Sequence, residues 1–214
     1  MLQPREILTR GPVTLRRWRA GDEEAVYRAV MQSQDHLLPW MAWAVDYSPA
    51  DAAGFVRQSA QDWESGTAFN YAITVAGDSA AEVAAEVAGE VGGEVAGSCG
   101  LMARIGPGGL EIGYWVHSGH TRRGLATAAA AALAAEAFTL PGIDRVEIVH
   151  DERNVVSGRI PRSLGFTEIG RRPQPPAGTA AHGDTAAHGD TAAHGDTAAH
   201  GDTADVVWRL MRPG

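Results

Sequence analysis

The sequence predicts a single domain of the α/β (α+β) class. Segments with alternating apolar residues, typical of strands, are interspersed with segments that have helical periodicity and clear helix start signals. Between Glu111 and Phe138 a predicted strand is followed by a short glycine-bearing turn and a helix. A chain of 214 residues with 44% hydrophobic and 21% charged residues is long and apolar enough to bury a core.

The first half of the chain predicts one strand, two helices and then three strands. The stretch 12–18 (PVTLRRW) alternates apolar and polar residues, which predicts a strand. Asp22 is placed to cap the first helix, and Ser48 starts a second helix that runs to about Trp63. The aromatic stretch 35–48 between them contains a proline and predicts a short helix or an ordered loop. The three strands are expected at 67–77, 97–106 and 109–116.

The second half predicts a helix, a strand, a helix and two last strands. The first of these helices begins near Leu125, and the strand that follows covers 144–150. Asn154 starts the next helix and Gly165 ends it. Pro161 lies inside this helix, where it should remove one hydrogen bond and bend the axis. The last two strands are expected at 167–173 and 205–211.

Two low-complexity repeats interrupt the domain, which otherwise spans residues 1–214. A Glu-Val repeat at about 79–96 lies between two predicted strands and is interpreted as an expanded hairpin tip, with partner binding as the alternative. The sequence TAAHGD recurs four times in the second insertion, about 179–204, and predicts a solvated loop. Its histidines recur every six residues, a period that suits neither one helix face nor a tetrahedral metal shell. We therefore expect no functional metal site, although a metal-handling role of this tract is the alternative hypothesis.

The charge and the cysteine content favour a cytoplasmic protein that does not bind nucleic acid. All 18 basic residues are arginine, and the eight acids of the two repeats account for the whole net charge of −8, so the rest of the chain is neutral. No apolar run approaches the roughly 20 residues that span a membrane, and the first ten residues lack the apolar core of a signal peptide. The lone Cys99 excludes an internal disulfide framework. No feature of the sequence indicates an oligomeric state.

The turn SGHTRRG before the alanine-rich helix predicts an anion site. The first amides of a helix have no partners within the helix, and they carry the positive end of its dipole. Gly124 lets the backbone approach an anion closely, and Arg122 and Arg123 supply charge. The spacing matches neither a dinucleotide-binding glycine motif nor a nucleotide triphosphatase loop. An ordinary capped helix with exposed arginines is the alternative.

Four stretches, in this order, carry a resemblance to a known family: LRRWRAGDEEAV, HLLPWMAWA, EIGYWVHSGHTRRGLATAAAAAL and RVEIVHDERNVVSGRIPRSLGF. Together they resemble the GCN5-related N-acetyltransferases (GNAT), within the branch that acetylates the N-termini of ribosomal proteins (RimJ/RimL-type). The resemblance covers the chain apart from the two repeats. It implies the GNAT fold, a mixed and strongly bent sheet of six to seven strands with helices on both faces.

The resemblance also implies that acetyl-CoA binds as co-substrate in a gap between the fourth and fifth strands. Its pyrophosphate would rest on the turn and its pantetheine would pair with the fourth strand, while an amide contact would come from the second motif. The residues that match these family positions are Trp115, Val116, Arg122, Arg123, Gly124, Leu125, Ala126, Thr127 and Asn154. Thr121 and Arg122 occupy positions where the family usually has arginine or glutamine followed by glycine, so we expect weakened or rearranged phosphate contacts but a retained site.

Acetyl transfer from the thioester requires a neutral amine and a proton for the departing thiolate. Glu111 lies on the fourth predicted strand and is the candidate base, with an ion pair to an arginine as the alternative role. Ser157 matches the family motif and is the candidate proton donor, with Tyr114 as an alternative on the opposite sheet face. Trp40 and Trp43 are candidates for the acceptor pocket.

The acceptor is expected to be a peptide N-terminus or a small-molecule amine. A non-catalytic acyl-CoA-binding module on the same fold is the alternative function, motivated by the altered turn at Thr121 and Arg122.

Overall fold

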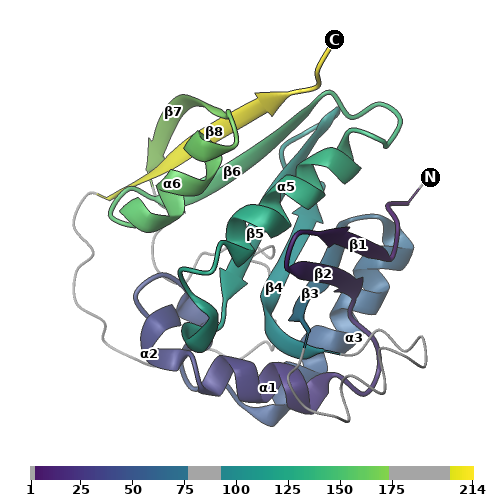
Figure 1. Cartoon of the computed structure of the whole chain (residues 1–214), viewed down its shortest axis with the longest axis vertical. Coiled ribbons are helices and arrows are strands. Elements are labelled where there is room, and N and C mark those ends of the chain that lie inside the picture. The colour runs from purple at the N-terminus through teal and green to yellow at the C-terminus, as the bar shows by residue number, and fades with distance from the viewer. Residues whose placement is uncertain (1–2, 77–92, 174–202) are drawn as a thin grey trace.

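The computed structural model describes residues 3–76, 93–173 and 203–214 (Figure 1). The first insertion is predicted at 79–96 and the second at 179–204, so both predictions fall almost entirely outside the described residues. Their last residues lie on strands that begin at Glu94 and Ala204.

The elements alternate as the sequence predicts, with one strand added near the N-terminus. In chain order they are β1 (Ile7–Arg10), β2 (Val13–Arg17), α1 (Glu23–Met31), α2 (Gln34–Leu37), the 3-10 turn η1 (Ala42–Ala44), α3 (Pro49–Ser65), β3 (Ala68–Val75), β4 (Glu94–Met102), β5 (Gly109–Val116), the 3-10 turn η2 (Ser118–His120), α5 (Leu125–Ala137), β6 (Arg145–Asp151), α6 (Val155–Ser163), β7 (Thr167–Pro173) and β8 (Ala204–Met211). As predicted, α6 contains Pro161. Strand β1 escapes prediction because only one of its four residues, Leu8, is buried.

The described strands form one eight-stranded sheet in the order β1-β2-β3-β4-β5-β6-β8-β7. All neighbouring strands pair antiparallel except β5 and β6, which are parallel. This mixed sheet agrees with the predicted fold class, and its eight strands exceed the expected six to seven because β1 is added.

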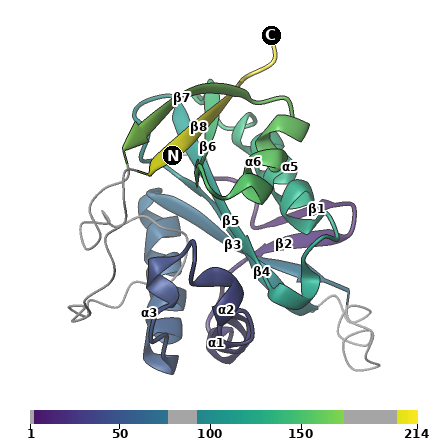
Figure 2. The ribbon, with the colours of Figure 1, turned by 90° about the vertical axis from the view of Figure 1, so that its left-hand side faces the viewer.

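Helices cover both faces of the sheet, and a hydrophobic core lies on each side (Figure 2). On one face α5 packs through Leu125, Ala129 and Leu133, and α6 contributes partly buried residues. On the other face α1 and α3 pack through residues that include Val26 and Phe55. Strand alternation distributes β5 between the two cores, because Ile112 lies in the first and Trp115 in the second.

Strands β5 and β6 diverge halfway along their length, as Figure 1 shows. Their pairing starts at Gly109 opposite Arg145 and ends at Ile112 opposite Ile148. Beyond this point β5 continues to pair with β4, and β6 continues to pair with β8 as far as Asp151. We call this divergence the strand split. Among the described residues, no strand pairs with this edge of β5 beyond Ile112.

Candidate active site

The turn between β5 and α5 adopts a backbone that glycine normally provides. Arg122 has φ +60° and Gly124 has φ +76°, so both lie in the left-handed region. A non-glycine residue in this region costs about 1–2 kcal/mol. Arg122 therefore adopts a conformation that glycine reaches without strain, at the position where the resemblance leads us to expect glycine.

Helix α5 begins at Leu125, as predicted, and its N-terminus is open. Gly124 is the N-cap residue, no side chain caps the helix, and the first turn contains no acidic residue. Leu125 is buried and anchors the turn, while Ala126 and Thr127 are half-buried. A Cβ atom added at Gly124 would meet nothing within 4 Å. This combination of free amides, positive charge and open space fits a phosphate group.

The main chain of β5 offers hydrogen-bonding groups to the strand split. His117 N donates to Ala96 O at 2.8 Å, and Ser98 on β4 is opposite Trp115. In an antiparallel pair the hydrogen-bonded positions alternate, so the main-chain groups of Trp115 point to β4. Those of Tyr114 and Val116 consequently point to the split, where an extended ligand can pair with them.

Glu111 lies on β5 one residue before the split and is only 4% exposed. Its Oε1 accepts a hydrogen bond from Arg104 Nη2 at 2.5 Å, so the ion pair considered as the alternative role is present. Glu147 is directly opposite on β6, is also buried, and pairs with Arg209 at 2.6 Å. The site thus contains two adjacent carboxylates, each balanced by a partly exposed arginine.

Ser157 and Tyr114 meet across the strand split, on the sheet face opposite Glu111. The Oγ of Ser157, in the first turn of α6, lies 3.3 Å from the hydroxyl of Tyr114. Asn154 caps α6, and its Oδ1 accepts from Ser157 N at 3.1 Å. Burial raises the pKa of Tyr114 to about 12, against the opposing effect of the Ser157 hydrogen bond. Tyr114 is therefore protonated at neutral pH and can donate.

The two tryptophans predicted for the acceptor pocket have different surroundings. Trp40 is 39% exposed. Trp43 in η1 packs against Trp115 and Tyr47, with ring centroids 6.2 and 5.8 Å apart. Within the described part of the chain, the indole N–H groups of Trp43 and Trp115 and the hydroxyl of Tyr47 are buried without a hydrogen-bond partner.

His117 and His120 were not among the predicted site residues, although His120 lies in the turn and His117 directly precedes it. Their rings lie 5.3 Å apart. His120 Nδ1 is 2.8 Å from Arg123 Nη1, and His120 Nε2 is 3.2 Å from Glu94 of β4. His120 lies within the motif SGHTRRG and His117 directly precedes it, and this was the only available signal, because the contact of His120 with Glu94 joins segments far apart in the sequence.

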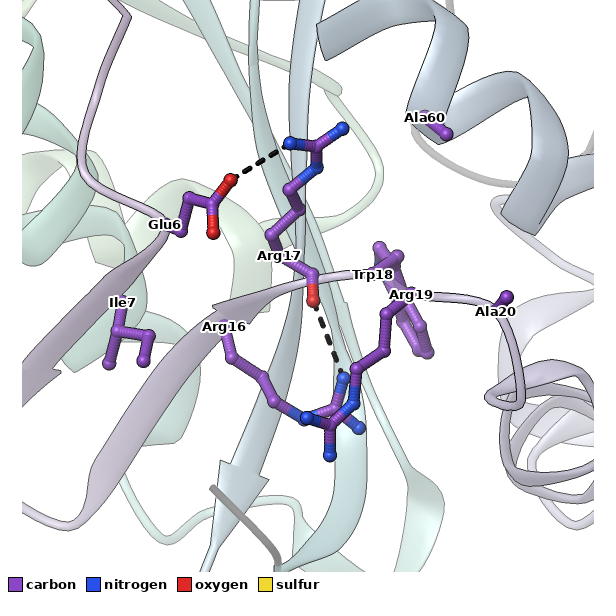
Figure 3. A pocket seen from close by; sticks show the side chains of 8 residues that line it. All are labelled: Glu6, Ile7, Arg16, Arg17, Trp18, Arg19, Ala20 and Ala60. Carbon is purple, nitrogen blue, oxygen red and sulfur yellow. Dashed lines mark hydrogen bonds and ion pairs between the residues drawn. The ribbon is translucent and has the colours of Figure 1, made fainter. Parts of the chain in front are cut away.

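A separate hollow of about 370 Å³ lies beside β1, β2 and α3, lined by Glu6, Ile7, residues 16–20 and Ala60 (Figure 3). None of the predicted site residues lines it. Arg16 forms a buried ion pair with Asp22 at 2.7 Å, and Arg17 pairs with Glu6 at 2.9 Å. Because acids neutralise these two arginines, we do not place the anion site in this hollow.

The described residues contain no group of three or more metal-ligating side chains placed to hold a metal ion. Across residues 3–76, 93–173 and 203–214, no helix is both long and apolar enough to cross a membrane.

Comparison with known proteins supports one family. Residues 13–167 match the sequence model described as "Acetyltransferase (GNAT) domain". No curated protein sequence matches the chain significantly. Among solved structures, RimJ from Mycobacterium smegmatis in complex with CoA-disulfide has a TM-score of 0.70 at 21% identity, covering 98% of this chain and 90% of RimJ.

Two further structures are similar. RimL, the ribosomal L7/L12 alpha-N-protein acetyltransferase in complex with coenzyme A, has a TM-score of 0.70 at 18% identity, covering 96% of this chain and 98% of RimL. The microcin C7 self-immunity acetyltransferase MccE, in complex with acetyl-CoA and AMP, has a TM-score of 0.70 at 17% identity, covering 94% and 92%. At these identities the structures show a common fold.

Proposed function

Because the chain belongs to the GNAT family of acetyltransferases, with acetyl-CoA as its co-substrate, we propose that it acetylates a primary amine by direct attack in a ternary complex. The acceptor would be the N-terminal α-amine of a protein or a small-molecule amine. The observation that carries the proposal is the open N-terminus of α5 beside the strand split, preceded by two arginines.

The turn and the strand split would bind successive parts of acetyl-CoA. Backbone amides from Arg122 to Thr127 would bind the pyrophosphate, with Arg123 adding charge. The main-chain groups that β5 directs to the split, on Tyr114 and Val116, would pair with the pantetheine. Trp115 of β5 would support this edge by pairing its main chain with β4, and Asn154 would offer its amide from the other side of the split.

The cost of deprotonating the acceptor amine favours an acceptor of low basicity. Deprotonating a peptide α-amine, with a pKa near 7.7–8.0, costs about 1 kcal/mol at pH 7, whereas a lysine amine near 10.4 costs roughly 4–5 kcal/mol. Arg104 already balances the charge of Glu111. Glu111 would act as the base for an α-amine, directly or through water.

Ser157 would protonate the departing thiolate. It lies at the start of α6 and faces the split, and Tyr114 is close enough to replenish its proton. The same pair of hydroxyls lies on the face opposite Glu111, so the proposed base and acid approach the split from different sides.

The acceptor would enter on the side of η1. Buried donors without a partner are rare in folded proteins, and a polar ligand or ordered water normally satisfies them. The unpaired N–H groups of Trp43 and Trp115 and the hydroxyl of Tyr47 support a place for an acceptor carbonyl there. Trp40 would contribute its partly exposed face nearby.

The test is thiol release from acetyl-CoA with a panel of peptide N-termini and small amines, using Glu111→Gln and Ser157→Ala. Exposed positions provide matched controls, Glu168→Gln and Ser163→Ala. Release with one acceptor class that falls at least about 100-fold in either site variant, and stays unchanged in the controls, supports the proposal. An absence of release, while acetyl-CoA still raises the melting temperature, would favour the non-catalytic acyl-CoA-binding module.

A further inference from the structure

Three side chains form a connected row beside the turn: Glu94, His120 and Arg123. The imidazole of His120 is buried, with 8% of the residue exposed. Its Nδ1 contacts Arg123 Nη1 at 2.8 Å and its Nε2 contacts Glu94 Oε2 at 3.2 Å. The row therefore connects the first residue of β4 to the turn that precedes α5.

The chemistry of the row determines where the imidazole proton lies. A guanidinium can only donate, so Nδ1 of His120 must accept from Arg123. The ring is then neutral and carries its proton on Nε2, which donates to Glu94. His117 is the other titratable group beside this ring, and its Nδ1 accepts from Gly119 N at 3.0 Å. Burial lowers the pKa of His117, which keeps this ring neutral beside His120 at neutral pH.

A neutral hydrogen-bond acceptor can orient an anion-binding arginine without compensating its charge, whereas a carboxylate compensates the charge. Arg16, Arg17 and Arg104 contact carboxylates directly, which compensates their charge. The imidazole of His120 separates Arg123 from Glu94, so the guanidinium is oriented while its charge stays available. Fixing a long side chain before a ligand arrives also reduces the entropy lost on binding.

We propose that His120 is a positioning residue that holds the Arg123 guanidinium at the start of α5 for the phosphates of acetyl-CoA. The proposal rests on the proposed function, in which the turn binds the pyrophosphate. It adds that His120 orients Arg123 for one of the phosphate contacts, and that His120 does so as a neutral imidazole.

The test compares three variants of His120. In His120→Asn the amide oxygen lies near the position of Nδ1 and can accept from Arg123, whereas in His120→Gln the amide lies near Nε2 and can reach only Glu94. We expect His120→Ala and His120→Gln to weaken acetyl-CoA binding about tenfold, the loss of one prepared charge-assisted bond, and His120→Asn to stay within about threefold of the parent. The acetyl-CoA Kd and the KM and kcat for acetyl-CoA are measured for each variant.

Turnover of S-acetylpantetheine, which lacks the diphosphate, distinguishes positioning from a general structural role. If His120 only stabilised the fold, its variants would also lose activity with this substrate. We expect turnover of S-acetylpantetheine to be equal in the parent and in all three variants. We also expect that Arg123→Ala weakens acetyl-CoA binding and that His120→Ala adds nothing in the Arg123→Ala background.

The outcomes separate the two proposals. If Arg123→Ala leaves the acetyl-CoA Kd unchanged, the pyrophosphate is not bound at this turn as the proposed function requires. If Arg123→Ala weakens binding but His120→Asn and His120→Gln behave alike, the positioning role is overturned. Equal losses with acetyl-CoA and S-acetylpantetheine would overturn it as well, because they would indicate general damage to the fold.

Discussion

The N-termini of α3 and α5 differ in how their first amides are satisfied. At α3, Ser48 Oγ accepts from Asp51 N at 3.3 Å, and the Asp51 carboxylate accepts from Ser48 N at 2.9 Å. At α5, Gly124 supplies no cap, and two arginines replace the acid. One helix start is thus completed by its own sequence, whereas the other has no side-chain cap and is the start at which we propose that an anion binds.

Giving α5 an acid like that of α3 should have the largest effect. We expect Gly124→Asp to weaken acetyl-CoA binding about 100-fold, because a carboxylate would occupy the amides and repel the phosphates. Gly124→Asn is the matched control, since asparagine has the same shape and also tolerates a positive φ. The Kd from calorimetry checks both variants, and equal weakening by Asp and Asn would rule out the electrostatic explanation.

The positive φ of Arg122, shortly before α5, provides a second test, of stability. We expect Arg122→Gly to be more stable than Arg122→Ala by about 1 kcal/mol, because both remove the charge but only glycine relieves the positive φ of +60°. Urea denaturation of the two variants measures the difference. Equal stabilities would show that the left-handed conformation carries no cost here.

Removing the cap of α3 should lower stability without touching the coenzyme. We expect Ser48→Ala to reduce the free energy of unfolding by about 1 kcal/mol and to leave the acetyl-CoA Kd unchanged. Ser48→Thr retains a capping hydroxyl and serves as the control. A change in acetyl-CoA affinity upon Ser48→Ala would break the distinction between the two helix starts.

Acid should lower the stability of the fold through His117, which lies just before the turn that precedes α5. This is the smallest expected effect. The folded state lowers the pKa of His117 through burial and through His120. A histidine with a lowered pKa favours folding above its unfolded value near 6.5, and this contribution is lost as the pH falls below that value. Between pH 7 and pH 5, His117→Gln should therefore lose less stability than the parent, measured by urea denaturation at each pH. The exposed His36→Gln is the control, and parallel pH profiles of His117→Gln and the parent would contradict the assignment.

Features of the site that depend on neighbouring residues could be predicted from the sequence, and features that depend on distant ones could not. The cap at Ser48 and the helix start at Leu125 follow from residues at most three positions apart. The contact between His120 and Glu94 joins segments on either side of β5, so no local pattern indicates it. The same holds for Tyr114 and Ser157, which meet only because β5 and α6 face each other.

The backbone strain at Arg122 and the ion pair of Glu111 could not be predicted from local sequence patterns either. The sequence showed that Arg122 stands where the family motif usually has glycine, but not that Arg122 would adopt the left-handed conformation. For Glu111 the sequence left two roles open, and only the position of Arg104 shows that the ion pair forms.

The strand split also divides the polypeptide by order of synthesis. Strands β1 to β5 come from residues 7–116, whereas β6 to β8 come from residues 145–211, so each side of the split is one continuous stretch of chain. The ribosome delivers the first side completely before the second side exists. The parallel contact of β5 with β6 thus joins a part of the sheet that is made early to a part that is made later, and acetyl-CoA lying along the split would need both parts to be present.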